Sequence, residues 1–206
     1  MKTFYCSDIQ ILDETIRPWT YQFRHVGEAW QRETASRLGL PIEKIVCVGE
    51  AAVPLGSPKA VEKIKGDGNC FFRCFSYLIT GKQNYHGDIR KIVCDALPVY
   101  APDFPEGSDA RHIKNMRNNA TFATEVELQA VARLLGVPIF TWSRFTAPLG
   151  SPEQPWRWVL WSPYLDRSQV VQDDIPGLYL DHAGLIHYDV VVKVKTPEED
   201  SRSRNV

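Results

Sequence analysis

The sequence predicts an α+β fold in which helices pack on a mostly antiparallel central sheet. Helical periodicity dominates up to about residue 136, whereas the segments that follow are rich in β-branched and aromatic residues. Helices that precede strands in this way are typical of α+β packing, because alternating strands and helices would instead predict a parallel sheet. A length of 206 residues indicates one domain of ordinary size.

Residues 1–60 carry no motif that we can place, and we assign them to an N-terminal extension that packs on the core. Within this extension, residues 27–41 (GEAWQRETASRLGLP) predict a helix that ends at a glycine and a proline. Residues 42–49 (IEKIVCVG) predict a short strand. Residues 53–60 (VPLGSPKA) predict a loop, from the spacing of their prolines and glycine.

A helix with a strong apolar pattern is predicted from Asn69 to Gly81. Its apolar side chains fall on one stripe and on the positions beside it: Cys70, Phe71, Cys74, Phe75, Tyr77, Leu78 and Ile79. Gly81 is suited to end this helix. Residues 88–97 repeat the helical period, and residues 108–119 predict a weaker, polar helix.

The best-defined helix of the sequence is predicted from Thr124 to Gly136. Thr124 and Glu127 stand three residues apart, which is the pattern of a capping box at a helix N-terminus. Gly136 is suited to end the helix. The pattern therefore predicts both ends of this element.

The remainder of the chain predicts strands and a disordered tail. Four segments have strand composition: 137–142, 156–161, 177–181 and 185–194. Residues 181–184 (DHAG) predict a hairpin turn between the last two. The tail, residues 196–206, is charged and nearly free of apolar residues, so we predict disorder there.

The charge balance argues against nucleic acid as a partner. Lys and Arg number 24 and Asp and Glu number 25, which gives a net charge of −1, whereas phosphate binding requires a clustered basic surface. No window approaches the ~18 apolar residues that a membrane span requires. Acidic residues interrupt the N-terminus before it reaches signal-peptide length. We therefore expect a monomer in the cytoplasm, with the nucleus as a second location, and no membrane partner.

The cysteine pattern indicates a reducing compartment. The five cysteines are Cys6, Cys47, Cys70, Cys74 and Cys94, and they include no C-x-x-C pair. Their odd number and their spacing argue against both a disulfide framework and a zinc site. We expect neither a metal nor a cofactor.

Cys70 follows the loop Gly-Asp-Gly-Asn and admits two interpretations. It is either a small buried hydrophobe at the start of a core helix or a nucleophile aimed by that loop. At a helix N-terminus, free N–H groups and the helix dipole favour the negative charge of a thiolate. The loop at residues 66–68 (GDG) can also turn its amides toward one point, as an oxyanion hole requires.

A cysteine nucleophile needs a base, and the sequence offers His25, His86, His112, His182 and His187. Only His187 lies in a strong strand pattern with an acid nearby. Because residues i and i+2 of a strand face the same side, His187 and Asp189 project together, and the carboxylate can fix the imidazole tautomer. This arrangement suits a Cys-His-Asp triad, although a His-x-Asp pair on a strand is often not catalytic. His182 is the nearest rival, but the predicted turn would place it in solvent. Cys74, one turn after Cys70, should point into the core.

Three motifs, in this order, resemble those of the ovarian tumour (OTU) family of cysteine proteases. Residues 66–81 (GDGNCFFRCFSYLITG) resemble the catalytic-cysteine box of that family. Residues 125–142 (EVELQAVARLLGVPIFTW) are similar to its middle helix and strand, and residues 186–191 (IHYDVV) to its C-terminal histidine box. The resemblance runs from about residue 64 to residue 194, and we place the catalytic domain at residues 61–195.

The resemblance implies a papain-like, OTU-type fold and a thiol protease that cleaves after the C-terminal glycine of ubiquitin through a thioester. It implies Cys70 as the nucleophile, His187 as the general base and Asp189 as the residue that orients the base. Asp67 would shape the loop, and backbone amides near Asp67, Gly68 and Cys70 would form the oxyanion hole. The implied partners are ubiquitin or polyubiquitin chains. Substrate-binding side chains are not assigned.

Two other functions stay open at this point. One is a ubiquitin-binding module without useful turnover, and the other is a papain-like protease for another ubiquitin-like modifier or a viral polyprotein. Thr124 and Glu125 stand where many relatives carry a Trp-Gly or similar pair, so substrate preference does not carry over from the family. The aromatic residues Trp142, Trp156, Trp158 and Trp161 are candidates either for walls of a binding site or for core packing.

Overall fold

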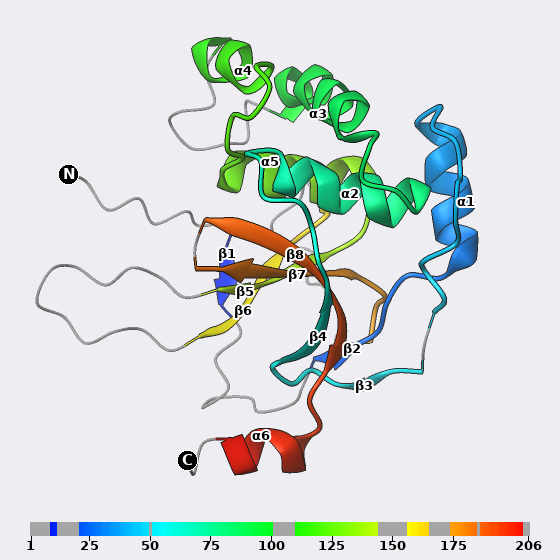
Figure 1. Cartoon of the computed structure of the whole chain (residues 1–206), viewed down its shortest axis with the longest axis vertical. Helices are drawn as coiled ribbons and strands as arrows, with labels where there is room; N and C mark the ends of the chain where they lie inside the picture. Colours follow the sequence, from blue (N-terminus) through cyan, green and yellow to red (C-terminus); the bar gives the residue numbers. More distant parts are fainter. Residues whose placement is uncertain are drawn as a thin grey trace, which may run out of the picture.

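The structure is a computed structural model that describes residues 9–11, 21–49, 51–100, 110–143, 156–164, 174–184 and 186–203. A layer of helices lies on one side of a twisted sheet, as Figure 1 shows. The helices are α1 (Glu28–Arg37), α2 (Cys70–Thr80), α3 (His86–Tyr100), α4 (Ala110–Met116), α5 (Glu125–Leu135) and α6 (Pro197–Ser203). The strands are β1 (Ile9–Ile11), β2 (Gln22–Phe23), β3 (Val53–Pro54), β4 (Pro58–Glu62), β5 (Ile139–Ser143), β6 (Arg157–Trp161), β7 (Leu178–Ala183) and β8 (His187–Val194).

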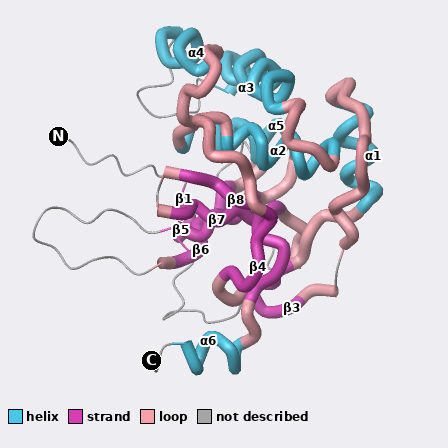
Figure 2. Tube along the Cα trace, in the orientation of Figure 1, coloured by secondary structure: helices cyan, strands magenta, loops and turns pink. Residues whose placement is uncertain are grey.

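The main sheet has six strands in the order β1-β6-β5-β7-β8-β4. All neighbouring strands in it are antiparallel except β5 and β7, which run parallel. β2 and β3 pair separately as a two-stranded sheet. In Figure 2 the helices α2 to α5 gather on one side of the strands, whereas α6 lies at the opposite end of the molecule. The predicted α+β class with a mostly antiparallel sheet is confirmed.

Two apolar clusters cover the two faces of the main sheet. The cluster between sheet and helices includes Phe71, Phe72 and Phe75 of α2, each at most 1% exposed. On the other face, the rings of Phe140 and Tyr179 stack with their centroids 4.9 Å apart. Complete burial of one large apolar side chain stabilises the fold by roughly 1.5–3 kcal/mol. α2 is therefore firmly seated on the sheet, and its N-terminus has a defined position.

The region before β3 packs on the helical layer through α1. Gln31 of α1 is fully buried, and its amide donates to the carbonyl of Lys44 at 2.8 Å. Its Oε1 accepts from the amides of Val46 at 2.9 Å and Cys47 at 3.1 Å. The predicted strand at residues 42–49 is therefore wrong, because these backbone groups bond to a side chain of α1 instead of to a neighbouring strand.

The other predicted elements agree well with the structure. α2 begins at Cys70 and is followed by Gly81, whose φ of 82° lies in the left-handed region. At the start of α5, the amide of Thr124 donates to the Glu127 carboxylate at 2.8 Å, which completes the predicted capping box. α1, α3 and α4 overlap the three other predicted helices, and β5 to β8 fall on the four predicted strand segments. Periodicity, capping residues and strand composition in the sequence were therefore sufficient to predict these helices and strands.

The predicted loop at residues 53–60 contains β3 and the start of β4, so this prediction is wrong. β4 is the last strand of the sheet and pairs with β8, with Val61 opposite Val191. The register shifts on either side of Ala60. Proline is tolerated at the start of an edge strand and next to such irregularities, so Pro58 signals a loop in the sequence but begins a strand in the fold.

The tail at residues 196–206 also differs from the prediction of disorder, because residues 197–203 form α6. The amide of Thr196 donates to the Glu199 carboxylate at 3.0 Å, as in a capping box. Asp200 is buried and accepts a hydrogen bond from the amide of Ser57 at 2.9 Å. The charged composition of this segment predicted disorder, but the segment forms a helix with a capping box, and the Asp200 carboxylate attaches that helix to Ser57.

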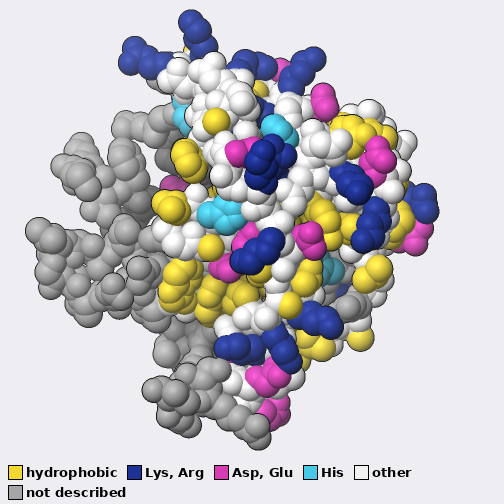
Figure 3. All heavy atoms as spheres, in the orientation of Figure 1, with side chains coloured by type: hydrophobic (Ala, Val, Ile, Leu, Met, Phe, Trp, Pro, Cys, Tyr) yellow, Lys and Arg dark blue, Asp and Glu magenta, His cyan; other side chains and the backbone are white. Residues whose placement is uncertain are grey.

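The described surface carries both signs of charge. On the face drawn in Figure 3, basic and acidic side chains are interspersed, and basic side chains gather over α4 at the top. Among the described residues, no helix combines the length and apolar character that crossing a bilayer demands.

Candidate active site

A cavity of about 370 Å³ lies at the N-terminal end of α2. Its lining comes from the start of α2, the segment before α5, and the strands β7 and β8: Gly68, Cys70, Phe71, Phe122, Ala123, Thr124, Glu125, His182, Ile186 and Tyr188. Most of these side chains are apolar, and Cys70 is the nucleophilic group among them. The cavity therefore offers a binding site directly beside the predicted nucleophile.

Cys70 is the first residue of α2 and is only 4% exposed. The first N–H groups of a helix lack partners within the helix, so they surround this position with hydrogen-bond donors. We call residues 66–69, which lead into the helix, the Cys loop. Gly68 in this loop has a φ of 78°, and a Cβ atom there would lie 2.5 Å from the carbonyl oxygen of Ala120. Only glycine fits at this point, so the loop backbone can approach the neighbouring segment closely.

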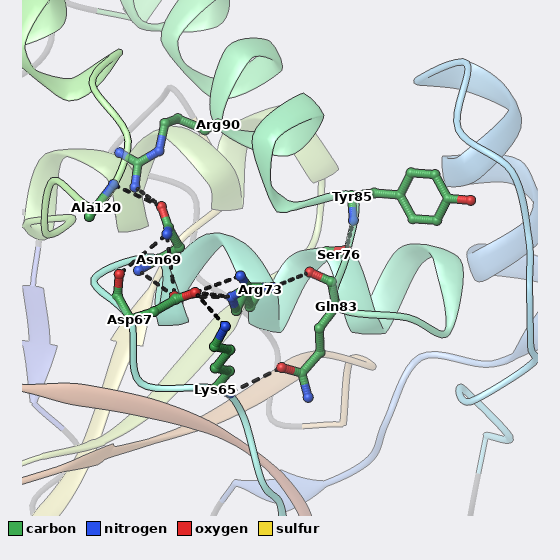
Figure 4. A network of polar contacts seen from close by, with 9 residues as sticks. All are labelled: Lys65, Asp67, Asn69, Arg73, Ser76, Gln83, Tyr85, Arg90 and Ala120. Atoms are coloured by element: carbon green, nitrogen blue, oxygen red, sulfur yellow. Dashed lines mark hydrogen bonds and ion pairs between the residues drawn. The ribbon is translucent and has the colours of Figure 1, made fainter.

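Asp67 holds the Cys loop in shape through its side chain (Figure 4). Its carboxylate accepts hydrogen bonds from Nε of Arg73 at 3.0 Å and from Nη2 of the same residue at 2.6 Å. It also accepts one from the amide of Asn69 at 3.2 Å. The Arg73 guanidinium is the largest cause that holds the pKa of Asp67 well below its ordinary value. Asp67 is therefore a charged anchor for the loop.

His187 and Asp189 of β8 are joined by a hydrogen bond of 3.1 Å between Nε2 and Oδ1. Asp189 is buried, and it also accepts from the amide of Ile64 at 2.8 Å and from Nζ of Lys63 at 2.8 Å. Burial alone would raise the pKa of Asp189, but these hydrogen bonds outweigh it and the pKa is lowered. The carboxylate is thus ionised near neutral pH and fixes the orientation of the imidazole.

The other ring nitrogen of His187 is on the side of the Cys loop. A Cβ atom on Gly66 would lie 3.6 Å from Nδ1 of His187. Because Nε2 is engaged by Asp189, Nδ1 is the atom left for proton transfer. The structure thus pairs His187 with Asp189 and brings the ring next to the loop that leads to Cys70, although the described cavity lining includes Cys70 and not His187.

Sequence reasoning misplaced the histidine that lines the cavity, which is His182. His182 lies within β7, opposite Tyr188 of β8, and not in the solvated turn that was predicted. Their rings stack with centroids 4.2 Å apart and planes within 4° of parallel, and both residues line the cavity. The turn is shorter than predicted, since β7 runs to Ala183 and Gly184 has the left-handed φ of 60°. The period-2 pattern, continued past residue 181, was the signal for this.

Other candidate residues belong to the core. Cys74 is fully buried, its thiol donates to the carbonyl of Tyr188 at 3.5 Å, and burial raises its pKa well above the ordinary value, as expected for a side chain that points inward. Trp158 and Trp161 are buried in β6, where their indole N–H groups donate to the Gly56 carbonyl and to the Thr141 hydroxyl, each at 3.0 Å. The described ranges contain no cluster of three or more His, Cys, Asp or Glu side chains placed to hold a metal.

Comparison with known proteins finds a family match for the part of the chain that contains Cys70. Residues 65–155 match the family model described as OTU-like cysteine protease. The OVARIAN TUMOR DOMAIN-containing deubiquitinating enzyme 9 of Arabidopsis thaliana is 34% identical over 87 residues, which are 40% of this chain and 25% of that protein. The OTU domain-containing protein 5-A of Danio rerio is 27% identical over 94 residues, which are 44% of this chain and 17% of that protein. The chain thus matches a quarter or less of the length of these relatives.

Solved structures that align with the chain include the OTU domain of OTUD1, with 22% identity, coverage of 65% of this chain and 85% of that chain, and a TM-score of 0.49. The OTU of Hazara virus bound to ubiquitin aligns with 17% identity, coverage of 66% and 82%, and a TM-score of 0.49. Residues 66–81, which include the Cys loop, and the cavity-lining residues 122–125 all lie within the matched residues 65–155. Over residues 65–155 the chain is thus similar to the OTU-like cysteine proteases.

Proposed function

We propose that this chain is a thiol-dependent deubiquitinase, which hydrolyses isopeptide and peptide bonds after the C-terminal glycine of ubiquitin. The observation that carries the proposal is the bond of 3.1 Å between His187 and the buried Asp189, on the strand that pairs with the segment leading to Cys70. A buried carboxylate that orients an imidazole, together with a cysteine at a helix N-terminus, is the set of groups that thiol proteases use. The name of the Arabidopsis relative, a deubiquitinating enzyme, supports ubiquitin as the substrate.

In the proposed first step, Nδ1 of His187 takes the proton of the Cys70 thiol, and the thiolate attacks the carbonyl carbon of the last glycine of ubiquitin. The electron pair of the C=O bond moves to oxygen, and amides near Asp67, Gly68 and Cys70 donate hydrogen bonds to this oxyanion. When the C=O bond re-forms, the C–N bond breaks and the amine leaves with the proton from His187. The product on the enzyme is a thioester.

In the proposed second step, a water molecule attacks the thioester carbonyl while His187 accepts its proton. The tetrahedral species collapses, the C–S bond breaks, and ubiquitin leaves as a C-terminal carboxylic acid, which loses its proton to solvent. Cys70 recovers its proton from His187. Asp189 keeps its charge throughout and stabilises the imidazolium in both steps, a role that the low pKa of its carboxyl supports.

The test uses ubiquitin with an electrophile at its C-terminus, incubated with the wild type, with Cys70→Ala and with Cys74→Ala. We expect a mass increase of one ubiquitin on the wild type and on Cys74→Ala, and none on Cys70→Ala. Cys74 is the matched control because it is one turn away in the same helix and fully buried.

Each other outcome removes a specific part of the proposal. No adduct on the folded wild type would refute a ubiquitin-directed thiol enzyme and favour another modifier or a polyprotein as substrate. An adduct without turnover of a ubiquitin amide substrate would favour a binding module. An adduct on Cys70→Ala would show that a different cysteine reacts.

A further inference from the structure

Asn69, the residue before Cys70, is buried and is held by two other segments of the chain. Its Oδ1 accepts hydrogen bonds from Nη2 of Arg90 at 2.8 Å and from the amide of Ala120 at 3.0 Å. Its Nδ2 donates to the main-chain carbonyl of Asp67 at 3.3 Å. Asparagine is a favoured N-cap residue, yet the Asn69 side chain does not cap α2. It fastens the Cys loop to its neighbours instead.

Arg90 reaches this place from α3 and is only 4% exposed. Besides Asn69, its guanidinium binds the carbonyl of Met116 at 2.8 Å and the carbonyl of Thr121 at 3.0 Å. Its Cζ also lies 4.0 Å from the centre of the Phe72 ring, within cation–π range. A planar guanidinium can hold several acceptors in fixed directions, which the single ammonium of lysine does less well.

The segment that Arg90 binds continues into the lining of the cavity. We call residues 120–125 the wall segment, because residues 122–125 line the cavity together with Gly68 and Cys70. Ala120 has a φ of 62°, which is uncommon for a residue other than glycine, and its carbonyl oxygen is the atom that excludes a side chain at Gly68. The Cys loop and the wall segment therefore touch at Ala120, and Arg90 is bonded to both.

Two arginines hold the Cys loop from different helices, as Figure 4 shows. Arg73, from α2 itself, forms an ion pair with Asp67. Arg90, from α3, binds the neutral oxygens of Asn69, Met116 and Thr121. A buried guanidinium is costly unless its hydrogen bonds are well placed. Arg73 joins the Cys loop to its own helix, whereas Arg90 joins the Cys loop to the wall segment and so fixes the distance between these two segments.

We infer that Arg90 is a positioning residue, which keeps the backbone amides of the Cys loop in register with the wall segment. The inference rests on the proposed function, in which those amides stabilise the oxyanion. Hydrogen bonds to the oxyanion act on the transition state and not on the bound substrate. Loss of Arg90 should therefore lower kcat and leave KM nearly unchanged.

The experiment compares the wild type with Arg90→Lys, Arg90→Met and a matched control, Gln31→Met. Gln31 is also a fully buried polar side chain that ties several backbone groups together, but it bonds to Ile79 at the other end of α2. All measurements are made well below the lowest Tm of the set, so that every variant is folded. The control separates a general loss of stability from an effect at the Cys loop.

Three quantities are measured on each variant. Turnover of a fluorogenic ubiquitin C-terminal amide gives kcat and KM. Alkylation by iodoacetamide gives the reactivity of Cys70 in a reaction that forms no oxyanion. Amide hydrogen exchange at residues 67–70 reports the order of the Cys loop without any substrate.

For Arg90→Met we expect kcat to fall on the order of 10²-fold, as for a misplacement of about 1 Å in a reacting group, with KM and the alkylation rate close to those of the wild type. Exchange at residues 67–70 should be faster, and Arg90→Lys should be intermediate. Gln31→Met should lower Tm and leave kcat and the exchange at residues 67–70 unchanged.

The inference is overturned if both Arg90 variants keep the wild-type exchange rates at residues 67–70, or if Gln31→Met matches them in every measurement. It is also overturned if kcat of an active wild type does not change in the Arg90 variants. If the wild type itself does not turn over the ubiquitin substrate, the proposed function fails by that result. Hydrogen exchange then decides alone whether Arg90 orders the Cys loop.

Discussion

Lys63 and Asp189 lie at the ends of a 2.8 Å ion pair in which the carboxylate is buried and the lysine side chain is 80% exposed. Burial would raise the pKa of Asp189, but the hydrogen bonds from Lys63, from the Ile64 amide and from His187 together lower it. The residue that orients His187 is therefore kept charged by the two residues that follow β4. On the proposed function, the acid side of the activity profile should therefore be sensitive to Lys63, a residue outside the proposed triad.

We expect Lys63→Met to shift the acid limb of the kcat/KM profile to higher pH. Without the ammonium, the pKa of Asp189 moves up, so protonation removes the orienting charge at a pH where the wild type is still active. Activity should fall several-fold on the acid limb and remain close to the wild type near pH 8. The pH dependence of ubiquitin-amide turnover measures this, with Lys91→Met as an exposed lysine control on α3. Superimposable profiles would show that the ion pair has no effect.

Gly68→Ala and Gly136→Ala form a matched pair that tests the close approach of Gly68 to the Ala120 carbonyl oxygen. Both glycines have a left-handed φ, of 78° and 68°, but an added Cβ meets the Ala120 carbonyl at 2.5 Å only at Gly68. We expect Gly136→Ala to lose about 1 kcal/mol of stability with unchanged kcat. Gly68→Ala should lose more stability, and its kcat should fall on the order of 10²-fold. Urea unfolding and turnover are measured together, and equal activity of the two variants would contradict the role of the contact.

Arg73→Gln should reduce stability in a pH-dependent way. The pKa of Asp67 is lowered in the folded state, chiefly by Arg73, so the ion pair contributes stability that is fully present above the unfolded pKa of about 4. That contribution is lost as the pH falls through the lower folded pKa. The difference in unfolding free energy between wild type and variant should be constant near neutrality and should shrink below about pH 4. Urea titrations across this range check it, and Asp67→Asn should lack this pH dependence.

Asp200→Ala tests whether α6 is docked. Asp200 is buried and accepts hydrogen bonds from the amide and the hydroxyl of Ser57. Loss of the carboxylate leaves the Ser57 amide without this partner, and we expect a loss of about 1–3 kcal/mol in the unfolding free energy with unchanged kcat. Glu198→Ala, an exposed position of the same helix, serves as the control. Equal stability of the two variants would indicate that the tail contributes nothing.

The sequence was sufficient wherever a signal was local. The capping box of Thr124 and Glu127, the glycines that end α2 and α5, and the His187-x-Asp189 pattern each depend on residues within a few positions of one another. The same holds for Cys70 at the first position of α2. These features define α2, α5 and three of the proposed catalytic residues.

The rest depends on contacts between distant parts of the chain. Nothing near Lys63 indicates that it will lie against Asp189, which is 126 residues away. Likewise, Arg90 reads as an ordinary helix residue until the fold places it between Asn69 and the wall segment. Sequence analysis did not predict the start of β4, because Pro58 indicates a loop although an edge strand tolerates it. The local sequence does not reveal the roles of Lys63, Arg90 and β4, because each role depends on a partner that is distant in the sequence and is brought close only by the fold.

The pairing of β4 with β8 has a consequence for thermal inactivation. β4 forms one edge of the sheet, and the Ile64 amide just beyond it donates to Asp189. Edge strands and chain ends open more readily than the centre of a fold. Each local opening of β4 would withdraw two donors from Asp189 while α2 and the rest of the sheet remain folded. We therefore expect the proposed activity to disappear on heating at a lower temperature than the cooperative unfolding of the core.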